Sequence, residues 1–193
     1  EAEFDWWQTD DGNSYGRSIE SGIVFRPTAN VALRFSPEYR WKRNHTQWVE
    51  NVDGADDSGD DTYVFGELRS RVIDLTTRAS ITFSRNLSLQ LYVQPFVATG
   101  SYDGYKKLAA PESYAFAPYA PDENHDFSRR SLKSNMILRW EYGPGSTLFV
   151  VWSQSRNHKS DYATFRPLDN VRDSFSDDGT NVLMAKVSHW IGL

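Results

Sequence analysis

The charged residues with the most regular spacing stand two apart along the chain, with apolar residues between them. In the stretch VALRFSPEYRW, residues 31–41, the charges fall on even positions and the odd positions are apolar. This is the pattern of a β-strand whose two faces meet different surroundings. We predict that one charged set faces the lumen of a β-barrel: Glu20, Arg34, Glu38, Arg40, Asp74, Arg78, Arg139, Glu141 and Lys186. A narrow barrel would pair these charges in a filled interior, whereas a wide one would hold them in a water-filled channel.

Four histidines could do acid–base chemistry, but their spacing matches no catalytic motif. They are His45, His125, His158 and His189, and none belongs to an HExxH pair. The chain also has no GxSxG elbow and no phosphate-binding loop. Ser153, Ser155 and Asp161 lie near His158 in sequence, although a triad is recognised by geometry and not by proximity. We therefore predict no catalytic residue, and a hydrolase at the external rim, near His45 or His158, stays the alternative.

An acidic segment, DGADDSGDD at 53–61, is the best candidate for a metal site. Carboxylates interrupted by glycine suit Ca²⁺, but no glutamate closes a twelve-residue EF-hand pattern. The candidate ligands are Asp53, Asp56, Asp57, Asp60 and Asp61. A solvated loop is the simpler interpretation, so no cofactor is predicted and Ca²⁺ is kept as the weaker alternative.

Composition excludes several classes of protein. The 193 residues include no cysteine, so disulfides and thiolate sites are absent. A net charge of −5 argues against binding to nucleic acid. No run of about 18 apolar residues could form a membrane-spanning helix, and no signal peptide opens the chain, so we expect a mature protein or a fragment.

The elements that must position these residues are long strands. Eleven-residue stripes of alternating character recur at 31–41, 73–83, 87–97 and 132–142. Ten steps of about 3.3 Å span about 33 Å, which at a tilt of about 45° rises close to the apolar band of about 25 Å of a membrane barrel. Soluble strands usually run to only about 5–6 residues.

Short and long connections alternate between these strands. Short turns are expected at 27–30, 85–86 and 143–145, and long external loops near 51–61, 106–127 and 159–178. The strands they join are expected at 2–9, 15–26, 31–50, 62–84, 87–105, 129–142, 146–158 and 180–193. The fold class predicted is all-β, an antiparallel up-and-down transmembrane β-barrel of about eight strands that fills residues 1–193.

Aromatic residues fall near both edges of the apolar stripes. We assign to the lipid interface Phe25, Phe83, Trp140 and Tyr142 at the edge near the short turns, and Tyr39 and Trp41 at the opposite edge. The stretch 146–158 is apolar on both alternating sets, so its facing stays open.

Two stretches resemble a known family. QPFVATGSYDGYKKLAAPESYAFAPY, residues 94–119, and RWEYGPGSTLFVVWSQSR, residues 139–156, resemble the C-terminal region of the bacterial family called domain of unknown function 5916. The resemblance covers roughly residues 62–193. It implies an outer-membrane barrel that follows a domain similar to family 9 carbohydrate-binding modules, in a longer chain. The barrel could then contain more strands than this chain supplies, and the family carries over no catalytic residues.

The function expected is that of an integral protein of the bacterial outer membrane, acting as a membrane anchor or as a passage domain for a polar or glycan ligand. The expected partners are the lipid bilayer and other domains of a longer parent chain. Enzymatic activity is the less expected outcome. Besides the rim hydrolase, a soluble eight-strand barrel that binds an apolar ligand stays open, because alternation alone does not tell the inner face from the outer one.

Overall fold

Alternation of apolar and polar residues produces β-strands through most of the chain that the structure describes, residues 1–53, 61–110 and 112–192 of a computed structural model. In chain order the elements are β1 (Ala2–Gln8), β2 (Tyr15–Ser21), β3 (Ile23–Thr28), β4 (Val31–Val52), β5 (Thr62–Ser84), β6 (Leu87–Leu108), β7 (Phe116–Pro118), β8 (Phe127–Gly143), β9 (Ser146–Ser160), α1 (Pro167–Ser174) and β10 (Gly179–Ser188). No helix in these described ranges is both long enough and apolar enough to cross a membrane.

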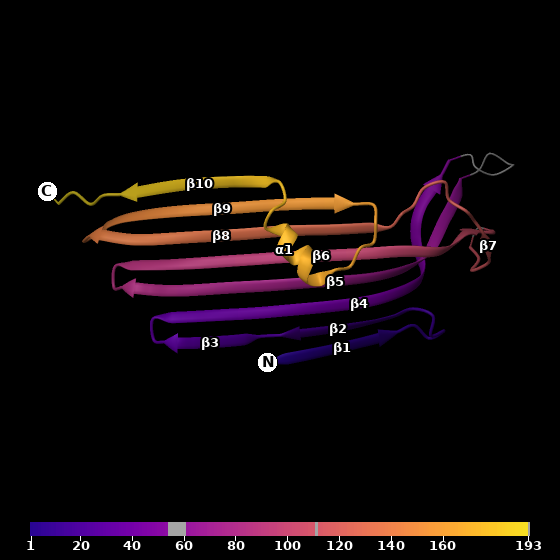
Figure 1. The fold of residues 1–193 in the computed structure, drawn as a ribbon, viewed down its shortest axis with the longest axis horizontal. Coiled ribbons are helices and arrows are strands. Elements are labelled where there is room, and N and C mark those ends of the chain that lie inside the picture. Colours follow the sequence, from indigo (N-terminus) through magenta and orange to yellow (C-terminus); the bar gives the residue numbers. More distant parts are fainter. Residues whose placement is uncertain (54–60, 111, 193) are drawn as a thin grey trace.

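All ten strands belong to one antiparallel sheet with the order β1-β2-β4-β5-β6-β8-β9-β10 (Figure 1). β3 continues β2 past Gly22 in the same register against β4, and β7 pairs with β6. The predicted all-β, antiparallel meander is therefore confirmed, including its weakest strand, β1. The sheet is open, however, with β1 and β10 as its two edges. Closure into a barrel stays a prediction.

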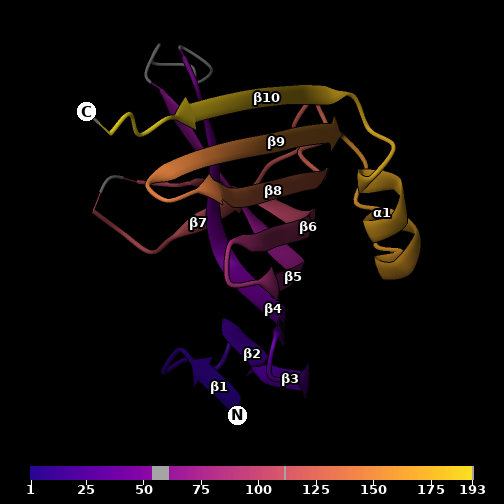
Figure 2. The same ribbon diagram turned by 90° about the vertical axis from the view of Figure 1, so that its left-hand side faces the viewer.

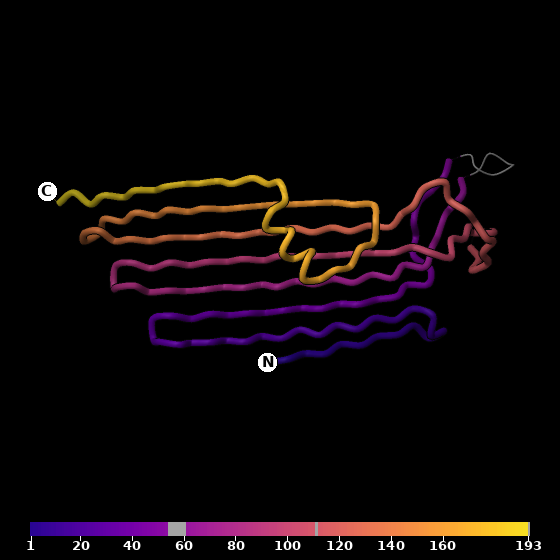
Figure 3. Tube along the Cα trace, viewed as in Figure 1, coloured from indigo at the N-terminus to yellow at the C-terminus, as the bar shows by residue number. Residues whose placement is uncertain are grey.

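Short turns and long connections lie at opposite ends of the sheet (Figure 3). We call the end with residues 28–31, 84–87 and 143–146 the turn end. At the loop end, β4, β6 and β9 end at Val52, Leu108 and Ser160. The three long loops predicted from the sequence follow these strand ends. β4, β5 and β6 are 22, 23 and 22 residues long and reach furthest toward the loop end.

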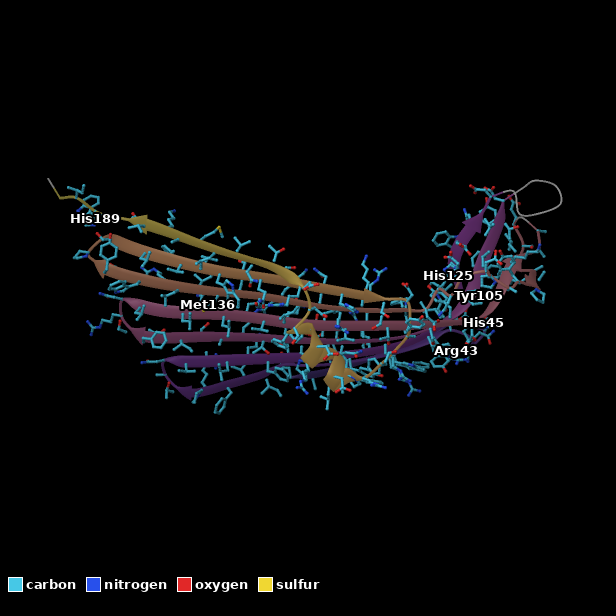
Figure 4. All side chains as sticks on the ribbon, turned by 45° about the horizontal axis from the view of Figure 1, so that its top comes forward. Arg43, His45, Tyr105, His125, Met136 and His189 are labelled. Carbon is cyan, nitrogen blue, oxygen red and sulfur yellow. The ribbon has the colours of Figure 1, made fainter. Side chains whose placement is uncertain are left out.

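The ends of β4 and β5 turn away from the plane of the sheet (Figures 1 and 4). Register shifts fall between Asn44 and Gln47, between Trp48 and Glu50, and between Phe65 and Glu67. Such irregularities bend a strand and increase its twist. The β4–β5 hairpin therefore continues as an arm beyond the regular sheet.

The strands are staggered along the sheet. Tyr39, Val97 and His158 belong to one row of paired residues that runs from β4 to β9. The distance from this row to the turn end is eight residues in β4, ten in β6 and twelve in β9, counted from Val31, Leu87 and Ser146. Since β6 is two strands from β4, and β9 four, the turn end moves by one residue for each strand crossed. A stagger of this kind accompanies the strand tilt of a barrel.

Few side chains are buried, because the sheet is mostly a single layer. Val97 and Leu132 are buried on β6 and β8, strands on which α1 packs. Val64 and Leu68 are buried near the loop end of β5. Figure 2 shows α1 on one side of the sheet and β7 on the other. The two faces are thus covered locally, by different connections.

Candidate functional site

The strand register places the alternating stripes in line with one another. One row of paired residues reads Leu33, Ala79, Leu91, Met136, Trp152 and Leu183. The next row reads Arg34, Arg78, Tyr92, Asn135, Ser153 and Val182. We call the side of the first row the apolar face and the side of the second the polar face. The candidate site is this pair of faces rather than a single cleft.

The apolar face leaves many large side chains uncovered. Phe4, Phe25 and Leu183 are 66%, 59% and 72% exposed. The exposed set on this face also includes Trp6, Ile19, Ile23, Leu33, Phe35, Tyr39, Phe83, Trp140, Tyr142 and Val187. Soluble monomers rarely expose contiguous apolar patches of more than a few hundred Å². A surface that crosses a whole sheet therefore requires an apolar neighbour.

The six predicted interface aromatics all lie on the apolar face, by register or by alternation. Tyr39 and Trp41 lie toward the loop end, where Tyr15 packs on Trp41 with ring centroids 5.1 Å apart. Phe25, Phe83, Trp140 and Tyr142 lie near the turn end, and the Trp140 and Tyr142 rings are 5.9 Å apart. Contact with lipid stays a prediction. Phe4 and Trp6 were not predicted at the interface, because β1 is short and polar on average.

The nine predicted lumen residues share the polar face. Glu20 lies directly opposite Glu38 on the neighbouring strand, and Glu38 lies opposite Asp74. Arg34 lies directly opposite Arg78 on the next strand. In another row, Phe149 on β9 separates Arg139 on β8 from Lys186 on β10. Two of these rows therefore hold like charges directly opposite one another, which is unfavourable unless water screens them.

The ion pairs on the polar face are local. Asp74 accepts from Thr76 at 3.0 Å and from Gln94 at 2.6 Å. Glu38 pairs with Arg40 at 3.1 Å, and Glu141 with Arg139 at 3.2 Å. Each of these ion pairs joins residues two apart on the same strand. Among the described residues, the polar face thus has no charge network that crosses the sheet.

The register settles the facing of residues 146–158. Leu148, Val150 and Trp152 lie on the apolar face, whereas Phe149 and Val151 lie on the polar face. With Ile137 and Met184, the last two line a hollow of about 730 Å³ bordered by Lys186. The polar face is therefore charged over β2–β5 and partly apolar over β8–β10.

A buried carboxylate, Glu67, organises the arm at the loop end. Its side chain is 8% exposed and accepts hydrogen bonds from Arg43 at 2.7 Å and from Arg69 at 2.8 Å. His45 Nδ1 lies 3.3 Å from the same carboxylate (Figure 4 labels Arg43 and His45). The hydrogen bond from Arg43, followed by those from Arg69 and His45, lowers the pKa of Glu67 to about 2, although burial raises it. This cluster was not predicted, because its members come from two strands, β4 and β5.

Aromatic side chains of β6 and β8, together with His125 just before β8, crowd the loop end of the sheet. Phe127 lies across Gly100, so closely that a side chain there would overlap its ring. Tyr102 and Tyr105 cover Gly66 and stack with ring centroids 6.3 Å apart. Burial raises the pKa of both phenols. The loop end of the sheet is therefore capped from the polar side.

The histidines do not assemble a hydrolytic site in the part of the chain that is described. His45 contacts Glu67, and His158 Nδ1 lies 3.8 Å from Asp177. The Ser14 hydroxyl contacts His45 only through its backbone N–H, whereas at the other end of the sheet Ser146 Oγ lies 3.3 Å from the His189 ring at Nδ1. Ser146 also accepts from the backbone N–H of Trp190, so this contact fastens the C-terminal segment.

Most of the acidic segment lies outside the described residues. Asp53 and Asp61 border the connection between β4 and β5, while Asp56, Asp57 and Asp60 lie outside the described residues. Within the described ranges, no group of three or more His, Asp or Glu side chains is arranged to hold a metal ion.

Comparison with known proteins identifies the family. A family model described as a domain of unknown function, DUF5916, matches residues 1–193. The chain belongs to the DUF5916 family. The family assignment therefore extends beyond the C-terminal resemblance at 62–193 to include β1–β4. No curated protein and no solved structure matches the chain.

Proposed function

We propose that this DUF5916 chain forms the wall of an integral β-barrel of the bacterial outer membrane, with the apolar face against lipid and the polar face toward an aqueous passage. The observation that carries the proposal is the exposed apolar face, which runs across the whole sheet opposite the charged face. Lipid is the surrounding that such a surface requires, and alternation across a barrel wall supplies the polar interior.

The stagger of the strands supports a barrel of membrane height. One residue per strand is a shift of about 3.3 Å over a strand spacing of about 4.8 Å, which corresponds to a tilt of about 35°. Membrane barrels have tilts of about 35–45°. At this tilt an eleven-residue stripe of about 33 Å rises about 27 Å, close to the apolar band of about 25 Å.

Membrane insertion requires that the two free edges be paired. An unpaired backbone N–H or C=O in hydrocarbon costs several kcal/mol, so open sheet edges do not occur there. We infer that β1 and β10 pair either with each other or with further strands of a longer parent chain. The domain would then anchor that chain in the membrane.

The charge pattern favours a passage over a dry, filled interior. The Glu20–Glu38–Asp74 row and the Arg34–Arg78 pair bring like charges together on the polar face. Buried in a packed interior, such groups would lack partners at a cost of several kcal/mol each. Water around them removes that penalty, so the proposed passage carries polar solutes. A glycan is one such solute, as the family resemblance implies.

The test is extraction and gel mobility. The protein is expected to stay in the membrane fraction until detergent is added, and to migrate differently on a gel before and after boiling. Planar-bilayer conductance of the purified protein then separates an open passage from a closed wall. Solubility without detergent, together with unchanged mobility on boiling, would rule the proposal out and favour the soluble barrel.

A further inference from the structure

The connection 161–178 lies against the apolar face. The Phe165 ring is 6.3 Å from the ring of Tyr39, and the Arg71 guanidinium stands 5.2 Å from the Phe165 centroid. α1 packs on β6, β8 and β9, across the strands and on the side opposite β7 (Figure 2). The contact between Tyr39 and Phe165 shows where this segment lies along the strands. It lies at the edge of the apolar stripes nearer the loop end.

Ionic contacts fix this segment in place. Arg130 holds Asp177 with two hydrogen bonds, each of 2.6 Å, and the Asp177 side chain is 8% exposed. Arg156 donates to the backbone carbonyl of the same residue. Asn170 is buried and donates to the carbonyl of Thr164 at 3.0 Å. Asp177 therefore attaches the segment to the sheet after the helix, and Phe165, against Tyr39 and Arg71, attaches it before the helix.

The anchored segment points apolar side chains away from the sheet. Leu168 is 85% exposed, Phe175 51% and Tyr162 72%. Leu168 and Phe175 are seven residues apart and so lie on one side of the helix, while the buried Asn170 and Ser174 face the sheet. In water these exposed side chains would gain nothing from being held in this position.

We propose that α1 and its flanking residues form an interfacial segment that lies in the outer headgroup region of the bilayer, with Leu168 and Phe175 against lipid. This rests on the proposed function, since it needs the apolar face to meet the membrane. The helix packs directly on the apolar face. If that face contacts lipid, the exposed side of the helix contacts the same lipid. Amphipathic helices in this position bury their apolar side at the boundary of headgroups and acyl chains. Tyr39 and Trp41 occupy the same level, where aromatic residues are enriched.

The chain has no cysteine, so a single introduced cysteine takes a spin label at one site. The protein is reconstituted in phosphatidylcholine–phosphatidylglycerol vesicles as Leu168→Cys, with Asp169→Cys as the matched control on another side of α1. Leu183→Cys on the apolar face and Lys186→Cys on the polar face serve as references. For each label, accessibility to oxygen is compared with accessibility to a water-soluble nickel complex.

The label at position 168 is expected to favour oxygen, as at 183, while the label at 169 favours nickel, as at 186. If the label at 183 is more accessible to oxygen but the label at 168 is more accessible to nickel, the segment lies in water. The inference is then wrong, while the proposed function still holds. If 168 is shielded from both reagents, a protein covers the helix and the lipid assignment is overturned. If the label at 183 also favours nickel, the proposed function itself fails, and the inference with it.

Discussion

At the scale of single residues, the buried carboxylate of Glu67 is a group that the sequence does not single out. Glu67 is a glutamate in a strand that contains other charges, and only the pairing of β4 with β5 brings Arg43 beside it. A nearly buried carboxylate that loses its partners costs several kcal/mol, so the pair and the arm are mutually dependent. Asp103, which also contacts Arg69 at 3.3 Å, is 52% exposed and so contributes much less.

Replacing Glu67 by Gln is expected to destabilise the arm at the loop end by about 2 kcal/mol, because Arg43 and Arg69 lose their common acceptor. Hydrogen exchange of the backbone amides in 43–52 and 62–70 measures the effect. The matched control is Asp103→Asn, which removes an exposed ion pair and is expected to cost less than about 1 kcal/mol. Equal effects from both variants would contradict a central role for Glu67.

The pKa of Glu67 also predicts a pH dependence of the arm. Its value of about 2 lies below the ordinary 4.5, so the folded arm favours the ionised form. The stabilisation is therefore fully present above pH 4.5 and is lost as the pH falls toward 2. Hydrogen exchange, corrected for the intrinsic effect of pH, is expected to show earlier opening of the arm below pH 4.5. In the Glu67→Gln variant, the extra opening of the arm below pH 4.5 should disappear. If it persists, another group causes the pH dependence.

At the scale of elements, the strands were predictable and their environment was not. The four period-two stripes lie in β4, β5, β6 and β8. The facing of 146–158, in β9, was left open because apolar residues fall on both of its faces. Helix α1 was missed, although Pro167 in its first turn and Asp169 after it are typical of a helix start. The sequence also did not indicate the buried positions of Val97 and Leu132, because α1 contributes to their environment.

Adjacent residues on a strand point to opposite faces of the sheet, so substituting two neighbours tests which face contacts lipid. Leu91 lies on the apolar face in mid-stripe, and its neighbour Gln90 points to the polar face. Leu91→Arg is expected to cost about 2–4 kcal/mol of stability in a bilayer, whereas Gln90→Arg is expected to cost little. Urea unfolding in vesicles measures both. A larger cost for the Gln90 variant would reverse the assignment of the faces and favour a soluble barrel with an apolar interior.

At the scale of the whole molecule, the open edges and the stagger point in the same direction. A flat, open sheet has no reason to shift its turn end steadily, whereas a sheet that follows a barrel wall must do so. The shift of one residue per strand, from β4 through β6 to β9, gives the orientation of the strands without knowledge of how many strands close the barrel. If the chain forms the proposed barrel wall, this stagger therefore predicts the tilt of its strands.

Polarised infrared spectroscopy of oriented bilayers measures that tilt from the dichroism of the amide bands. The strands are expected at about 35° to the membrane normal, within the range of about 35–45° that membrane barrels show. A sheet adsorbed on the membrane surface through its apolar face would instead place its strands parallel to the bilayer plane. In that case lipid would still cover the exposed apolar face, but the proposed barrel and its passage would be wrong. The Leu91→Arg variant is the control, because a barrel that depends on insertion should lose its ordered tilt when that stripe is interrupted.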